Sequence, residues 1–289
     1  MVTRNIEGQT SILNSSFNPA IGAVFDSVLD WTDDGTEEDG VDASLRTFEL
    51  TLSADIDPNA WAYSVIVWED EEVEVEEGAM IFEAFDSNFS IKAGRFFVDF
   101  GKQMQVHPHD LRTVERPLVL RNYLGRELGG DGVQFDDWFA AGDTTAVRYS
   151  LGLFGSLLGE AEDEDDFTPT AFDDDRKAFD ELAFTARITA FGNLSARTQV
   201  QAGLSWRGIP NYGFRLEESG ATAENLSNNV LGADLTWNWM DASASEIWTA
   251  GTEVLVSTGD LGAETDDGGT PGDASDDTVT GLDGNALGY

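Results

Sequence analysis

The sequence contains no cysteine and no run of about 18 apolar residues, the length that a membrane-spanning helix requires. The absence of cysteine excludes a disulfide-stabilised scaffold and a cysteine nucleophile. Without a long apolar run, the chain is either soluble or a membrane-spanning β-barrel, because no other structure pairs every backbone group inside lipid. At 289 residues, the chain is long enough for either class.

Positive charge is also scarce, since 16 Lys and Arg residues face 55 Asp and Glu residues and the formal net charge is -39. So acidic a chain is unsuited to binding nucleic acid. More than half of the acids fall in four blocks, which we predict to be loops or turns between strands. These blocks are residues 32–43, 69–77, 160–181 and 260–284.

Between the blocks run segments of about ten residues in which apolar and polar side chains alternate. A period of two indicates a β-strand with one apolar and one polar face. About eleven such segments in succession predict an all-β fold, an antiparallel transmembrane β-barrel with about 11–12 visible strands, as one domain over residues 1–289. The clearest segments are residues 46–56, 145–154, 182–191, 197–207, 230–239 and 247–256. We expect their apolar faces to point outward to lipid.

Tryptophan lies at or near the ends of several segments, where a barrel carries its interfacial aromatic residues. The residues concerned are Trp31, Trp61, Trp206, Trp237, Trp239 and Trp248. The alternative is a secreted soluble β-sandwich with a carbohydrate-binding or hydrolytic role, in which these aromatic rings form the core. The number and uniform length of the segments favour the barrel.

Both ends of the sequence indicate a larger protein. Residues 1–7 contain no apolar signal region, and residues 285–289 resemble the beginning of another strand. We therefore expect the chain to be truncated at both ends, as a fragment of a larger barrel.

The few basic residues gather in one part of the chain. Seven of the 16 lie between Lys92 and Arg126, with only three acids among them. Residues 101–130 also break the alternating pattern and are too long for a hairpin turn, as functional loops often are. We predict that they form an inward constriction loop that attracts anions. The candidate lining residues are Lys92, Arg95, Lys102, His107, His109, Arg112, Arg116, Arg121, Arg126 and Arg148. An ordinary external loop is the alternative.

Other site chemistry has weaker support in the sequence. His107 and His109 flank a proline but lack an evident third ligand, so we predict no metal site there. Residues 266–269 and 273–277 resemble fragments of a calcium loop, yet no complete loop is present, and solvated acidic loops are the preferred interpretation. No phosphate loop or nucleophile elbow occurs. We therefore predict no cofactor and no enzymatic activity.

Five short motifs resemble porin-like outer-membrane proteins of Gram-negative bacteria, which are similar in layout to the phosphate-selective porin family. The motifs begin at Phe17 (FNPAIGAVFD), Ile91 (IKAGRFF), Val106 (VHPH), Glu115 (ERPLV) and Gly130 (GDGVQ). The resemblance implies a barrel in the bacterial outer membrane whose inward loop binds anions through Arg and Lys. Porin-like barrels often associate as trimers, so a homotrimer is an expectation from the resemblance alone.

The expected function is passive diffusion of small solutes, with anions such as phosphate as the expected cargo and the lipid bilayer as the surrounding partner. A ligand- or metal-uptake barrel whose loop forms a plug is the alternative within the same fold class.

Overall fold

The computed structural model describes residues 19–33, 40–69, 72–84, 87–111, 113, 115–125, 127–155, 157, 167–170, 178–216, 222–243, 245–266 and 278–288. In these residues no helix has the length and apolar character needed to cross a membrane. The first seven strands are β1 (Ala20–Thr32), β2 (Gly40–Asp57), β3 (Ala60–Glu69), β4 (Glu72–Glu83), β5 (Ser90–Phe97), β6 (Gly129–Ala140) and β7 (Thr145–Phe154). The others are β8 (Phe167–Thr170), β9 (Ala183–Ser195), β10 (Thr198–Leu216), β11 (Thr222–Met240), β12 (Ile247–Asp266) and β13 (Thr278–Gly288). Three short helices are η1 (Pro108–Asp110), α1 (Leu118–Leu124) and η2 (Phe179–Glu181).

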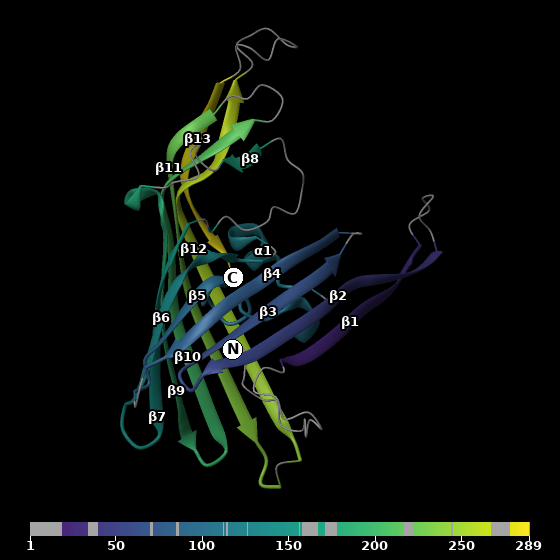
Figure 1. The fold of residues 1–289 in the computed structure, drawn as a ribbon, viewed down its shortest axis with the longest axis vertical. Coiled ribbons are helices and arrows are strands. Elements are labelled where there is room, and N and C mark those ends of the chain that lie inside the picture. The colour runs from purple at the N-terminus through teal and green to yellow at the C-terminus, as the bar shows by residue number, and fades with distance from the viewer. Residues whose placement is uncertain are drawn as a thin grey trace.

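All the described strands form one antiparallel sheet in which almost every strand pairs with its neighbours in the sequence. β8 is the exception, because it pairs only with β10, and β7 therefore pairs directly with β9. Figure 1 shows the sheet curving around α1, with β1–β4 running obliquely and β6, β7, β9, β10 and β12 nearly upright. β1 and β13 are the two edges and are not paired with each other in the described residues, so the sheet is open. The predicted all-β antiparallel fold is confirmed.

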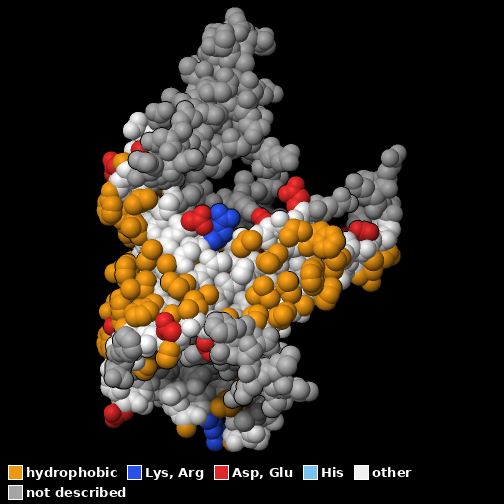
Figure 2. Space-filling model, viewed as in Figure 1, with side chains coloured by type: hydrophobic (Ala, Val, Ile, Leu, Met, Phe, Trp, Pro, Cys, Tyr) orange, Lys and Arg blue, Asp and Glu red, His pale blue; other side chains and the backbone are white. Residues whose placement is uncertain are grey.

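The sheet exposes its apolar face and buries its polar face, which is the reverse of the arrangement in a soluble protein. Leu151, Leu204 and Leu235 point outward and are 52%, 61% and 47% exposed, whereas Ser150 and Asp234 on the opposite face are buried. Figure 2 shows hydrophobic side chains gathered over β1–β4 and along the left edge, with charged side chains mostly above and below this band. The period of two in the sequence therefore places apolar side chains outside and polar side chains inside, as the barrel prediction requires.

The connections differ between the two ends of the sheet. Because the strands alternate in direction, the connections 58–59, 84–89, 141–144, 196–197 and 241–246 all lie at one end. The four acidic blocks all adjoin strand ends at the other end. The block 69–77 differs from the predicted turn, because β4 begins at Glu72 and carries most of it. Likewise β12 extends to Asp266 and β13 begins at Thr278, so strands occupy much of block 260–284.

Between β5 and β6 the chain crosses the concave face of the sheet as residues 98–128, which we call the inward segment. Its apolar side chains Phe100, Met104, Leu120, Leu124 and Leu128 are almost fully buried. They pack with inward side chains of the strands, among them Phe96, Phe154, Val230 and Leu255. Pro117 precedes α1, and Gly125 ends it with a φ of 83°, a backbone angle that favours glycine. The hydrophobic core therefore lies inside the curve of the sheet and anchors the inward segment there.

Candidate functional site

The larger cavity lies between the inward segment and the concave faces of β2–β7, and its volume is about 820 Å³. Its basic residues are Lys92, His107, His109 and Arg148. Carboxylates outnumber them among the described lining residues, namely Glu49, Glu77, Glu83, Asp99, Asp110, Asp136 and Asp137. The lining of this cavity is therefore charged, and negative groups predominate among its described residues.

Asp99 connects the inward segment to two strands. Its carboxylate accepts a hydrogen bond of 2.6 Å from Arg148 in β7 and lies 3.3 Å from Nε of Arg187 in β9. Ser150 donates a further hydrogen bond of 2.7 Å, and Asp99 is only 3% exposed. Arg187 also donates to Asp234 of β11 at 2.7 Å. Charge-assisted hydrogen bonds of this kind are stronger than those between neutral groups, and here they join the inward segment to β7 and β9.

Glu77 in β4 is a second buried carboxylate with several partners. It accepts hydrogen bonds from the Tyr63 hydroxyl at 2.7 Å and from the Phe97 backbone amide at 3.1 Å. Its other oxygen lies 3.0 Å from Nε2 of His107. Lys92 of β5 approaches Glu77 at 3.7 Å and also lies over the Phe96 ring at 4.3 Å. These contacts join β3, β4, β5 and the inward segment at one point.

Two further carboxylates surround the histidines. Nδ1 of His107 lies 3.0 Å from Oε2 of Glu76 and 3.6 Å from Oε2 of Glu49. Nδ1 of His109 lies 3.0 Å from that same Glu49 oxygen. Burial by itself would lower the pKa of His107, but the nearby carboxylates of Glu76, Glu77 and Glu49 outweigh it and raise the pKa to about 10.

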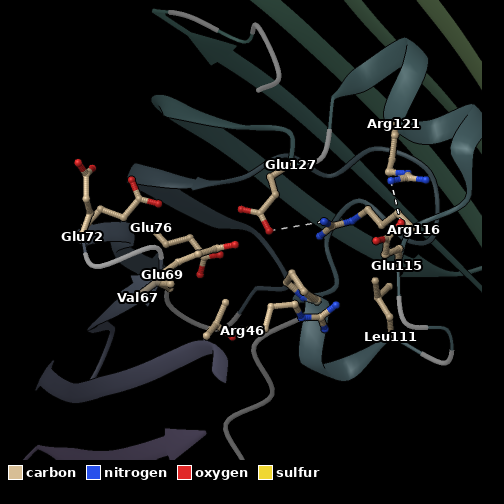
Figure 3. A pocket seen from close by; sticks show the side chains of 13 residues that line it. Arg46, Val67, Glu69, Glu72, Glu76, Leu111, Glu115, Arg116, Arg121 and Glu127 are labelled. Atoms are coloured by element: carbon tan, nitrogen blue, oxygen red, sulfur yellow. Dashed lines mark hydrogen bonds and ion pairs between the residues drawn. The ribbon is translucent and has the colours of Figure 1, made fainter. Parts of the chain in front are cut away.

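A smaller cavity of about 380 Å³ lies beside the first, between the edges of β2–β4 and the inward segment. Figure 3 shows Glu69, Glu72 and Glu76 on one side and Arg116 and Arg121 on the other. Arg116 lies 3.5 Å from Glu127, and Arg121 lies 2.8 Å from Glu115. The guanidinium groups are therefore already paired with carboxylates.

The predicted lining residues separate into groups. Lys92, His107, His109 and Arg148 line the larger cavity, and Arg116 and Arg121 line the smaller one. The Lys102 ammonium donates to the Thr236 hydroxyl at 2.6 Å. Arg112 and Arg126 lie outside the described residues.

Arg95 does not line either cavity. It alternates with Lys92 and Phe96 along β5, and its exposed side chain pairs with Asp131 of β6 at 3.0 Å on the outer face. The alternation along β5 predicts this outward position. Lys92 and Arg95 are an odd number of residues apart and therefore lie on opposite faces of the strand.

Sequence reasoning missed the carboxylates Glu49, Glu76, Glu77 and Asp99. Glu76 and Glu77 are adjacent, and a strict period of two would place one of them outside. The pairing of β3 with β4 contains an irregularity at this point, where Val65 pairs with Glu77 and Ile66 pairs with Val75. Such a bulge inserts one extra residue, here Glu76, and both carboxylates face inward as a result, Glu77 buried and Glu76 with a side chain that is 10% exposed. No signal in the sequence marks this bulge.

No protein-family model matches the chain. An uncharacterized protein of Aquifex aeolicus (strain VF5) is 31% identical over 129 residues, which cover 45% of this chain and 26% of that protein. The aligned region therefore spans about a quarter of that relative.

Two solved structures are similar at 10% sequence identity. OmpTdeltaL8, the loop L8 deletion mutant of the Vibrio cholerae outer membrane protein OmpT, gives a TM-score of 0.36 with 86% of this chain and 85% of that chain covered. The outer membrane channel DcaP of Acinetobacter baumannii gives a TM-score of 0.28 with 86% and 93% covered. TM-scores below 0.5 do not establish a common fold, so the function is inferred from this chain's own residues.

Proposed function

We propose that the chain forms the wall and the inward segment of a porin-like channel in a bacterial outer membrane, through which small solutes diffuse without an enzymatic step. The reversed sheet carries this proposal, because Leu151, Leu204 and Leu235 are exposed outside while Ser150 and Asp234 are buried inside. An outer face with so many exposed apolar side chains requires contact with lipid. The short connections at one end of the sheet, with the acidic blocks at the strand ends of the other, also match the layout of bacterial outer-membrane barrels.

The charges inside favour small cations over anions. Two positive groups of the larger cavity are paired, Lys92 with Glu77 and Arg148 with Asp99 and Asp136. Further carboxylates of the cavity lining, such as Glu49 and Glu83, add negative charge. A lumen with surplus carboxylates raises the local concentration of cations. Passage of anions such as phosphate, predicted from the basic stretch, remains the alternative, and the sign of the reversal potential decides between the two.

Planar-bilayer recording of the full-length protein in a KCl gradient tests the proposal. We expect discrete conductance steps, and we expect the reversal potential to have the sign of a channel that prefers K⁺ to Cl⁻. Lys92→Gln should increase that preference, because it removes a positive charge from the inner face. Arg95→Gln is the matched control, because it removes a positive charge from the outer face of the same strand and should leave the reversal potential unchanged.

Absence of conductance from a correctly folded protein would exclude the channel. Equal effects of the two β5 variants would show that the concave face does not line the conducting path. A wild-type reversal potential of the opposite sign would support the anion alternative.

A further inference from the structure

We propose that Glu49, Glu76 and His107 bind a divalent transition-metal ion such as Zn²⁺, which fastens the inward segment to β2 and β4. The site lies between the two cavities, and Figure 3 shows Glu76 from the side of the smaller one. This proposal goes beyond the channel function and does not depend on it, because a metal ion can bind here whether or not solutes cross.

The separations between the donor atoms fit one shared ion. One ligand atom from each of Glu49, Glu76 and His107 falls within 4.8 Å of the others. The two closest approaches to Nδ1 of His107 are 3.0 Å and 3.6 Å. Zn²⁺ binds nitrogen and oxygen at about 2.0–2.2 Å, so two donors on one ion lie roughly 3–3.5 Å apart. Nδ1 of His109 lies 3.0 Å from the same Glu49 oxygen and so contacts one of the three donors from outside the group.

Two buried atoms at this place lack hydrogen bonds. Oε2 of Glu76 and Nδ1 of His107 face each other at 3.0 Å, yet neither makes a hydrogen bond to any described residue. The Glu76 side chain is only 10% exposed, so bulk water does not readily satisfy it. A buried polar atom without a hydrogen bond destabilises the fold. A cation bound between the lone pairs of Oε2 and Nδ1 removes this destabilisation.

The remaining contacts of His107 prepare its ring for a metal. Nε2 lies 3.0 Å from Glu77, whose other oxygen is held by Tyr63 and Phe97. A carboxylate that accepts the Nε2 proton leaves the lone pair on Nδ1, and this is how carboxylates orient metal-binding histidines. The inward segment therefore presents Nδ1 toward Glu49 and Glu76.

The local charge also favours a divalent ion. Glu49, Glu76 and Glu77 place three buried carboxylates around one imidazole, and Lys92 supplies a positive charge only on the Glu77 side. Buried carboxylates require nearby cations. Mixed imidazole and carboxylate donors suit Zn²⁺ better than the oxygen-binding ions Ca²⁺ and Mg²⁺. A proton bound to Nδ1 of His107 would compete with the metal ion for this position.

Calorimetric titration of the purified full-length protein with Zn²⁺, after chelator treatment and in excess Mg²⁺, tests this proposal. Mg²⁺ occupies the acidic blocks, so that one high-affinity equivalent of Zn²⁺ can be distinguished. Glu76→Gln and His107→Gln each remove one donor with little change in volume. Glu83→Gln is the matched control, because it removes a carboxylate of the same cavity six residues along β4 from Glu77, about 20 Å away.

We expect one tight equivalent in the wild type, a dissociation constant raised at least about tenfold in Glu76→Gln and His107→Gln, and no change in Glu83→Gln. Zn²⁺ should also slow proteolysis within residues 101–111 of the wild type but not of Glu76→Gln. Absence of a tight equivalent from the wild type would overturn the proposal, as would equal binding by all the variants. Circular dichroism identifies a variant that fails to fold, and the wild-type titration then decides alone.

Discussion

The ring of Phe100 lies against Gly232 so closely that a Cβ on Gly232 would stand 2.9 Å from two of its atoms. Phe100 belongs to the inward segment and Gly232 to the concave face of β11. Real Cβ atoms essentially never approach other atoms below 3.0 Å, so this contact depends on glycine. The fully buried ring thus fixes the depth at which the inward segment crosses the sheet.

Replacement of Gly232 by Val should therefore displace the inward segment. We expect faster protease cleavage within residues 101–111 in Gly232→Val than in the wild type, with strand content unchanged by circular dichroism. Gly251→Val is the control, because the nearest atoms to a Cβ there are at 3.6 Å, an ordinary contact. Equal cleavage of Gly232→Val and Gly251→Val would contradict the prediction.

A charged side chain on the outer face should destabilise the protein. Leu204 is exposed on β10, and Leu204→Lys should cost about 2–4 kcal/mol of the free energy of unfolding if this position lies near the middle of the bilayer. Leu204→Met should cost much less, since it keeps an apolar side chain. Urea unfolding in lipid vesicles measures both variants. A cost for lysine no larger than for methionine would show that this face does not contact lipid.

Asp99 and Asp131 are two aspartates in ion pairs with very different burial. Asp99→Asn leaves Arg187 without one buried partner and should cost about 3–5 kcal/mol of the free energy of unfolding. Asp131→Asn breaks the exposed pair with Arg95 and should cost no more than about 1 kcal/mol. The same vesicle assay compares them, and similar costs would contradict the burial described for Asp99.

The turn between β11 and β12 should be sensitive to acid. Asp241 accepts hydrogen bonds from the Ser243 side chain and from the Glu246 amide at 2.9 Å, and these lower its pKa below the usual value. The pKa of Asp241 is lower in the folded state than in the unfolded state. The stabilisation by these hydrogen bonds is therefore fully present at a pH above the unfolded-state pKa, and it is lost as the pH falls through the folded-state pKa.

NMR of the Glu246 amide provides the measurement. Its signal should shift only at a pH below the ordinary range for aspartate, and Asp241→Asn should abolish that shift. A midpoint at the ordinary aspartate value would contradict the prediction.

The sequence predicts the fold well and the site only in part. Alternation in β7, β10 and β11 indicates both the strands and their outward faces, because each apolar residue keeps its side of the sheet over many residues. The predicted strands were too short, however. Acidic residues such as Glu74 and Asp266 have low strand propensity, yet pairing with neighbouring strands holds them in β4 and β12.

The candidate site depends on contacts that alternation does not reveal. The basic stretch pointed to the inward segment, but the partners of its charges lie far away in the sequence, as Arg148 does from Asp99. A bulge at Glu76 changes which side chains face inward. Pairing of this kind arises only once the sheet has formed and the segment has packed inside it.

The unequal ends of the sheet also affect how the protein enters a membrane. Carboxylates cross lipid at a high free-energy cost, and the strand ends with the acidic blocks carry many of them. At the opposite end, the two-residue connections 58–59 and 196–197 contain Arg197 as their single charged residue. In bacterial outer-membrane barrels the longer connections lie outside the cell and the short turns face the periplasm, so a barrel of this layout carries its acidic blocks across the bilayer as it inserts. The charge of these blocks therefore adds to the free-energy cost of insertion and, once the sheet spans the bilayer, opposes its return.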